Sequence, residues 1–133
     1  MARTLSRVVD TMNYDGLISG IEPAVKVGGG TIRKLGTAGT LVRGTVLAKS
    51  GGSAGDGKLV ILGTTAASNE TLTPNCILAE DIEVGTASDV NAAVFEMGCF
   101  DPEKLVVKSG HTFSAAEKDA LRTRGIYLAA VSN

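Results

Sequence analysis

Short aliphatic and β-branched runs separated by glycine are the feature of this sequence that most limits its fold. The 133-residue chain contains 17 glycines, well above the usual share of roughly 7%. Aromatic residues make up only 4% of the chain and tryptophan is absent, so a core must be built from Val, Ile, Leu and Ala. This pattern predicts many turns and short strands rather than a helical bundle.

The chain divides into two unequal parts. Its length suits one domain with a single modest core. Residues 1–22 carry mixed charge and small polar side chains, and they lack a long regular apolar pattern. We therefore expect an N-terminal arm at 1–22 that is flexible in the free protein, followed by a compact β-rich domain at 23–133. The candidate contact residues of the arm, all apolar or aromatic, are Leu5, Val8, Val9, Tyr14, Leu17 and Ile18.

Two segments look like interruptions between strands. The glycine triplet at 28–30 is flanked by extended segments at 24–27 and 31–35, and we interpret the triplet as a turn. The segment 64–75 is rich in Thr, Ser and Asn and contains Pro74, so we interpret it as a polar connection.

Two other segments carry clear strand signals. Thr40–Ala48 is β-branched and apolar but contains Gly44, and a glycine inside a strand commonly marks a bulge or a barrel corner. Val90–Phe100 follows a period of two, which predicts a half-buried strand with Phe95 and Met97 facing inward.

One helix is predicted in the C-terminal half. Ser114 and Glu117 have the spacing of a capping box, and Gly125 stands where a helix C-terminus favours glycine. The residues expected on the inward face are Phe113, Ala116, Ala120 and Leu121. Residues 126–131 then read as a closing strand. The fold class is therefore mainly β (α+β), a small barrel-like domain with one helix.

Charge is segregated along the chain, although the net charge is only −1. Between Pro23 and Gly55 the charged residues are all basic: Lys26, Arg33, Lys34, Arg43 and Lys49. Between Leu59 and Glu103 they are all acidic: Glu70, Glu80, Asp81, Glu83, Asp89, Glu96, Asp101 and Glu103. Oppositely charged strands could pair within one monomer, or positive and negative faces could meet between subunits.

Nucleotide binding is disfavoured by the one stretch that resembles a P-loop. Residues 52–58 have the Gly-x4-Gly-Lys spacing, but Leu59 stands where a Ser or Thr must bind Mg²⁺. The following residues look like a strand, whereas a P-loop leads into a helix. We interpret residues 50–57 as a flexible hairpin loop.

No other group of residues forms a convincing catalytic or metal site, so we expect no enzyme activity and no cofactor. His111 is the only histidine, and it could pair with Ser109 or Ser114, but no nucleophile elbow is present. Cys76 and Cys99 lack metal-ligand spacing, so we expect buried free thiols, which suit a reducing cytoplasm. Glu80 and Asp81 are neighbours and would point to opposite faces of a strand, as a solvated edge.

Composition also argues against general nucleic-acid or membrane partners. A net charge of −1 provides no excess of cations for a phosphate backbone or an anionic membrane. No stretch approaches the roughly 20 apolar residues that span a bilayer, and the N-terminus lacks the apolar region of a secretory signal.

Five blocks, occurring in order over most of the chain, resemble the lambda-type head decoration family of tailed bacteriophages. The blocks are 13–20, 41–47, 77–81, 97–100 and 120–128. The positions within them that we take as the family signature are Arg43, Gly44, Val46, Leu47, Gly98, Phe100, Gly125 and Ile126.

The resemblance implies a structural virion protein without a cofactor. It implies homotrimers at three-fold and quasi-three-fold positions on the exterior of the expanded head, assembled in the host bacterial cytoplasm. Such trimers would bind the major capsid protein and stabilise the capsid against the pressure of packaged DNA. The arm would order on binding and add to a capsid sheet.

Two alternatives remain at this point. A lipoyl- or biotinyl-type carrier module would present a modified lysine at a hairpin tip, for which Lys49 and Lys58 are imperfect candidates. A head spike or tail-associated protein would share the virion class but not the position on the head.

Overall fold

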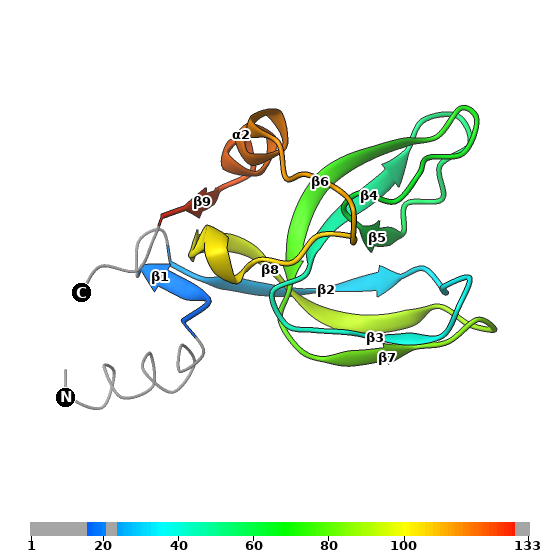
Figure 1. Cartoon of the computed structure of the whole chain (residues 1–133), viewed down its shortest axis with the longest axis horizontal. Helices are drawn as coiled ribbons and strands as arrows, with labels where there is room; N and C mark the ends of the chain where they lie inside the picture. The colour runs from blue at the N-terminus through cyan, green and yellow to red at the C-terminus, as the bar shows by residue number, and fades with distance from the viewer. Residues whose placement is uncertain (1–15, 21–23, 130–133) are drawn as a thin grey trace.

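The computed structural model describes residues 16–20 and 24–129, which form a β-rich domain with one α-helix (Figure 1). In chain order the elements are β1 (Ile18–Gly20), β2 (Lys26–Ile32), β3 (Gly39–Leu41), β4 (Val46–Gly51), β5 (Leu59–Ile61), β6 (Thr71–Leu78), β7 (Ile82–Val84), β8 (Val90–Phe100), the 3-10 helix η1 (Pro102–Lys104), α2 (Ala115–Thr123) and β9 (Ile126–Leu128).

Five of the strands close into a small barrel. The strand order is β8-β2-β5-β4-β6, and β6 pairs again with β8 to complete the ring. All of these pairings are antiparallel except β2 with β5, which are parallel and meet only where Ile32 pairs with Leu59. Strands β3 and β7 form a separate two-stranded ribbon (Figure 1). The predicted barrel-like β fold is therefore confirmed.

Strand β8 belongs to two sheets because it is long. Its first part pairs with β2 and β6 in the barrel. Its last residues pair with β1, antiparallel, and with β9, parallel, so that Phe100 lies opposite both Ile18 and Leu128. This second sheet carries the two ends of the described chain away from the barrel.

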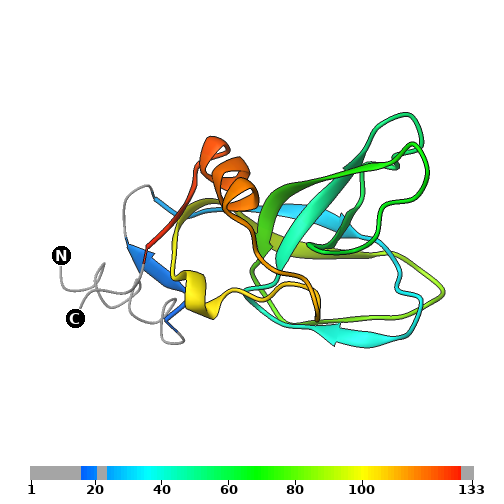
Figure 2. The same cartoon turned by 45° about the horizontal axis from the view of Figure 1, so that its top comes forward.

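Apolar side chains form two clusters, so the single core expected from the chain length is divided. Residues of all five barrel strands, together with Leu41 of β3 and Val84 of β7, make one cluster, as expected for a barrel interior. Alternate residues of β4, β5, β6 and β8 face outward and pack under β1, α2 and β9. Figure 2 shows α2 lying against the outside of the barrel beside β6.

Strand β8 contributes to both clusters, which corrects the half-buried interpretation. Phe95 is buried in the outer cluster, as predicted, and its ring centre lies 5.3 Å from that of Phe100. Val94 and Ala92, on the opposite face, are buried in the barrel interior. Met97 is only half-buried and lies against Gly125.

The glycine triplet is not a turn, and this prediction was wrong. Residues 28–30 lie within β2 and pair continuously with β8. An added Cβ at Gly30 would lie 2.5 Å from Leu59 Cδ1, and one at Gly28 would lie 1.5 Å from Glu96 Oε2. The glycines therefore allow close packing across the strand rather than a change of direction.

Strand β6 extends into the segment that we interpreted as a connection. It begins at Thr71 and includes Pro74, which is buried. The register of β4 with β6 shifts at this point, where Ala48 pairs with Pro74 and Leu47 with Cys76. A bulge accommodates proline because the ladder is interrupted there and one N–H is not required.

The predicted helix is confirmed, although one residue of its inward face was misassigned. Ser114 and Glu117 form the capping box, and Gly125 follows the helix with φ +100°. Leu121 is fully buried between β6 and β9. Ala116, which was expected to face inward, is exposed because α2 contacts the domain along a narrow stripe.

Gly44 forms the corner at which the chain leaves β3 and enters the barrel. Its φ is +98°, a value that residues with a Cβ rarely adopt. A Cβ at this position would also lie 2.9 Å from the backbone oxygen of Lys104. The prediction of a corner at this glycine is confirmed.

Candidate functional site

The described chain begins and ends at the same end of the molecule, in the sheet formed by β1, β8 and β9 (Figure 1). The N–H of Asp101 donates to the oxygen of Leu17 at 2.8 Å, and the N–H of Ala129 donates to the oxygen of Phe100 at 2.9 Å. This sheet therefore fixes the point from which residues 1–15 leave the domain.

The predicted arm residues fall into two groups. Leu17 and Ile18 are buried in the outer apolar cluster, with 2% and 5% of their surface exposed. In this conformation their side chains stabilise the domain and are not available to a partner. Leu5, Val8, Val9 and Tyr14 lie outside the described residues.

The signature residues lie in the barrel and in the end sheet formed by β1, β8 and β9. The guanidinium of Arg43 lies 5.1 Å from the centre of the Phe95 ring and donates to the oxygen of Ala79 at 3.2 Å. Gly98 has φ +147°, and an added Cβ would lie 2.9 Å from Cζ of Phe100. The buried signature residues are Gly44, Val46, Leu47, Gly98, Phe100 and Ile126, whereas Arg43 and Gly125 are half-buried. Their positions explain a structural role, not a direct contact with a partner.

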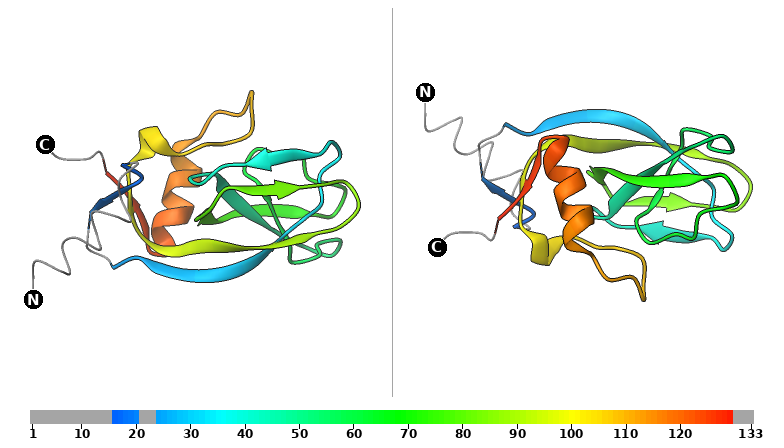
Figure 3. Two further views of the ribbon diagram at one scale, coloured as in Figure 1. Left: turned by 90° about the horizontal axis from the view of Figure 1, so that it is seen from below. Right: turned by 90° about the horizontal axis from the view of Figure 1, so that it is seen from above.

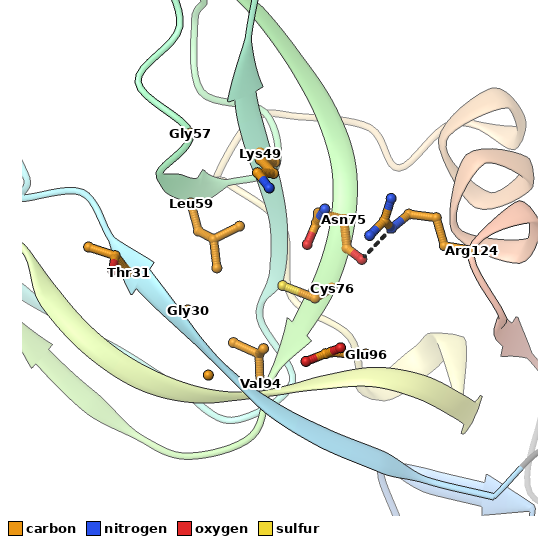
Figure 4. Close-up of a pocket in the computed structure, with 11 residues that line it drawn as sticks. Gly30, Thr31, Lys49, Gly57, Leu59, Asn75, Cys76, Val94, Glu96 and Arg124 are labelled. Carbon is orange, nitrogen blue, oxygen red and sulfur yellow. Dashed lines mark hydrogen bonds between the residues drawn. The ribbon is translucent and has the colours of Figure 1, made fainter.

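A cleft of about 310 Å³ opens between β2 and β8 on one side and β4, β5 and β6 on the other (Figure 4). Its lining residues are Gly29, Gly30, Thr31, Lys49, Gly57, Leu59, Asn75, Cys76, Val94, Glu96 and Arg124. Because three of these residues are glycines, part of the cleft wall is formed by backbone without side chains. Our sequence interpretation missed this cleft because the glycine triplet was assigned to a turn.

The cleft is lined by one thiol, that of Cys76. Burial raises the pKa of the Cys76 thiol to about 12, so the thiol stays protonated at neutral pH and is a poor nucleophile. Cys99 is also free and buried, as predicted for both cysteines. Within residues 16–20 and 24–129 no three His, Cys, Asp or Glu side chains are grouped as metal ligands.

The P-loop-like segment is a hydrogen-bonded loop between β4 and β5. Arg33 Nη2 lies 2.9 Å from Asp56 Oδ1 and 2.6 Å from Glu70 Oε2. The hydroxyl of Ser50 donates to the same Glu70 oxygen at 2.5 Å. The loop leads directly into β5, so it lacks the helix N-terminus that a P-loop provides.

These contacts predict a loss of stability in acid. The hydrogen bond from Arg33 holds the pKa of Asp56 at about 2. Hydrogen bonds from the Ala67 N–H, the Ser50 hydroxyl and Arg33 hold the pKa of Glu70 at about 2. Both pKa values lie below the ordinary values of 3.8 for aspartate and 4.5 for glutamate. As the pH falls, these carboxylates are therefore protonated in the unfolded chain before they are protonated in the folded one. The contribution of these two carboxylates to stability should be fully present above their ordinary pKa values and should be lost as the pH drops toward about 2.

The measurement is the midpoint of urea unfolding as a function of pH. Arg33→Gln should lose less stability in acid than the wild type, because it removes the two hydrogen bonds of Arg33 to Asp56 and the one to Glu70. Lys34→Gln is the matched control, since it removes a neighbouring positive charge but keeps the backbone N–H that donates to Asp89. Parallel pH curves for the wild type and Arg33→Gln would contradict the assignment.

The remaining candidate side chains have structural partners. His111 Nε2 lies 2.8 Å from Oε2 of Glu117, the capping-box residue. Burial opposes ionisation of Glu117, but hydrogen bonds from the Ser114 N–H and His111 outweigh it and lower the pKa of Glu117. Histidine and carboxylate thus connect the α2 N-terminus to the preceding loop.

Glu80 and Asp81 also bind backbone groups instead of forming only a solvated edge. Glu80 accepts a hydrogen bond from the N–H of Ala93 at 2.8 Å, and Asp81 accepts one from the N–H of Arg43 at 2.7 Å. Both carboxylates satisfy N–H groups next to β7.

The charge segregation is partly explained within the monomer. Arg33 pairs with Glu70, and Lys26 lies 4.0 Å from Glu96. These two pairs connect the basic and acidic segments of one chain. Lys49, in the cleft, has no ion pair among the described residues, so the alternative of charge pairing between subunits stays open there.

Comparison with protein families identifies the family of this fold. A family model described as bacteriophage lambda head decoration protein D matches residues 9–126, which covers most of the chain and all eight signature positions. No curated protein matches the chain. None of the described helices is long and apolar enough to cross a membrane.

Proposed function

Because this chain belongs to the family of the bacteriophage lambda head decoration protein D, we propose that it forms trimers on the outside of the expanded phage head. The family is one of structural virion proteins, and the match over residues 9–126 is the observation that carries the proposal. The trimers would occupy three-fold and quasi-three-fold positions, bind the major capsid protein and stabilise the shell against packaged DNA. Assembly would take place in the host cytoplasm.

The arm would provide the contact with the capsid. Residues 1–15 lead directly into β1, whose position is fixed by its pairing with β8. Ordering an extended segment costs roughly 1–2 kcal/mol per residue, so the capsid must provide compensating contacts. Addition of the arm to an open sheet edge would supply main-chain hydrogen bonds, while Leu5, Val8 and Val9 would supply apolar contacts. Tyr14 would add a further contact of the arm.

Electron cryo-microscopy of decorated heads tests the placement. We expect three copies of the domain around each three-fold and quasi-three-fold position, with additional density that connects Gly16 to the capsid surface. Single copies scattered away from these positions would contradict the proposal.

The carrier alternative has less support from the two candidate lysines. Lys58 forms an ion pair with Asp89, and Lys49 lies within β4 rather than at a hairpin tip. A carrier lysine must be free to enter the active site of a ligase. An unchanged intact mass after expression with biotin or lipoyl ligase is the expected result.

A further inference from the structure

The edge of β2 that faces away from β8 is open at Gly29. In β8, the oxygen of Ala93 accepts from the N–H of Ala79 at 3.0 Å, and the N–H of Ala93 donates to Glu80 at 2.8 Å. Both backbone groups of Ala93 therefore point away from β2. Gly29 lies opposite Ala93 in the antiparallel ladder, so its own N–H and C=O must point away from β8.

The same alternation applies along the strand. Val27 lies two residues before Gly29, so its backbone groups also point to the outer edge. The N–H of Arg33, on the same side, donates to the oxygen of Leu59 in β5 at 2.9 Å. Strand β5 meets β2 only at Ile32. Among the described residues, nothing pairs with the edge formed by Val27 and Gly29.

The register of β2 with β8 shifts between Lys26 and Val27, which ends the regular edge on that side. From Val27 to Gly30 the edge carries no charge or proline, features that usually prevent strand addition. Gly28, Gly29 and Gly30 place no side chain on it, and a Cβ built at Gly29 would meet no atom within 4 Å. Val27 is 52% exposed, the largest value among the exposed large hydrophobic residues. The edge also opens directly onto the cleft (Figure 4).

The side chains around the cleft have an excess of positive charge. Lys49 and Arg124 both line it, and the Arg124 Nε–H donates only to the backbone oxygen of Asn75. The one acid of the lining, Glu96, lies beside Lys26 at 4.0 Å. A strand with acidic side chains would therefore complement this edge better than a basic one.

The ribbon β3–β7 offers such a strand. Strand β7 pairs with β3 alone, so its other edge is open in the described chain. Glu80, Asp81 and Glu83 lie in or just before β7. Glu80 and Asp81 already bind backbone N–H groups, whereas Glu83 is exposed and has no ion pair among the described residues.

We propose that the β2 edge and its cleft receive the acidic β7 edge of a second copy of this chain. The contact rests on the proposed function, because it would form the interface of the trimer. It joins two different surfaces, and such heterologous contacts can close into rings of three. Figure 3 shows β2 along one flank of the molecule and the β3–β7 ribbon toward the opposite flank, as a ring requires.

A contact between the β2 edges of two copies is less favourable. It would place Lys49 and Arg124 of both copies close together, and like charges at an interface are costly. It would also be isologous and stop at a dimer.

Zero-length cross-linking tests the contact in the unmodified protein. A carbodiimide joins a lysine amine to a carboxylate only where the two touch. Equal amounts of isotope-labelled and unlabelled protein are cross-linked on decorated heads and, separately, in concentrated free solution. We expect mixed-isotope peptides that join Lys49 to Glu83. Their absence from both samples overturns the inference.

Two sets of variants test the two parts of the contact. Gly29→Pro removes an N–H that points away from β8, so the fold should survive while strand addition is blocked. Gly29→Ala is the matched control, because it keeps the N–H and its Cβ meets no atom. Only the proline variant should lose the cross-linked trimer. Equal trimer yields from the two variants, both correctly folded by circular dichroism, would overturn the inference.

Charge reversal provides the second set. Lys49→Glu and Glu83→Lys should each lower the trimer yield by at least about tenfold, and the double variant should recover most of it. Failure of the double variant to recover would overturn the charge pairing. Mixed-isotope cross-links in free solution, without any decoration of heads, would support this interface while contradicting the proposed function.

Discussion

Deletion of residues 2–12 should reduce capsid affinity by at least about a hundredfold, or on the order of 3 kcal/mol. It should leave the melting temperature of the free protein nearly unchanged. Leu17 and Ile18 are buried in the domain's own cluster, whereas residues 2–12 lack the long regular apolar pattern of a core segment, so we expect their loss to change stability little. Equilibrium binding to undecorated heads and thermal unfolding of the free protein are the two measurements.

Replacement of residues 2–12 by a Gly-Ser segment of equal length is the control for chain length. It should bind as weakly as the deletion, because the apolar contacts of Leu5, Val8 and Val9 are lost in both. Undiminished affinity of the deletion variant would show that the domain alone carries the contact.

The substitution Leu121→Ala should lower the free energy of unfolding by roughly 2–5 kcal/mol, the usual range for a fully buried leucine. Leu121 has 0% of its surface exposed and is the one buried residue of α2. The smaller side chain would leave a cavity between the helix and the outer face of the barrel. Urea unfolding followed by circular dichroism gives the change in free energy.

Asp119→Ala, on the exposed face of the same helix, is the matched control. It should change the free energy by no more than about 0.5 kcal/mol, as is usual for surface positions. A loss for Leu121→Ala that is as small as this would mean that the helix is not an integral part of the core.

Features encoded by neighbouring residues could be predicted from the sequence. The capping box of Ser114 and Glu117 depends on residues three positions apart, and the positive φ of Gly125 follows from its place after the helix. Gly44 could be assigned to a corner for the same reason, because a single residue must absorb the change of direction. Each of these features depends only on residues a few positions apart along the chain.

Features that depend on a distant partner could not be predicted. The glycine triplet in β2 is needed because Leu59 and Glu96 cross its face, and neither contact can be seen from the sequence around the triplet. Pro74 lies in β6 because the register with β4 shifts there. The same limit applied to the ion pairs, where Arg33 joins two loops that are far apart along the chain.

The candidate surfaces, like the fold, could be predicted from the sequence only in part. Composition led us to expect an arm at 1–22, but Leu17 and Ile18, which we assigned to it, have side chains buried in the core. Lys49 was considered only as a carrier lysine. Its position beside an open strand edge depends on the closure of the barrel, which brings β4 next to β2 through β5.

The most direct test of the central claim is co-sedimentation of the purified full-length protein with expanded, undecorated phage heads. The account predicts saturable binding, with three copies for each three-fold and quasi-three-fold position, and no further binding to heads that are already decorated. Protein that stays in the supernatant at every concentration, while the heads sediment intact, would contradict it.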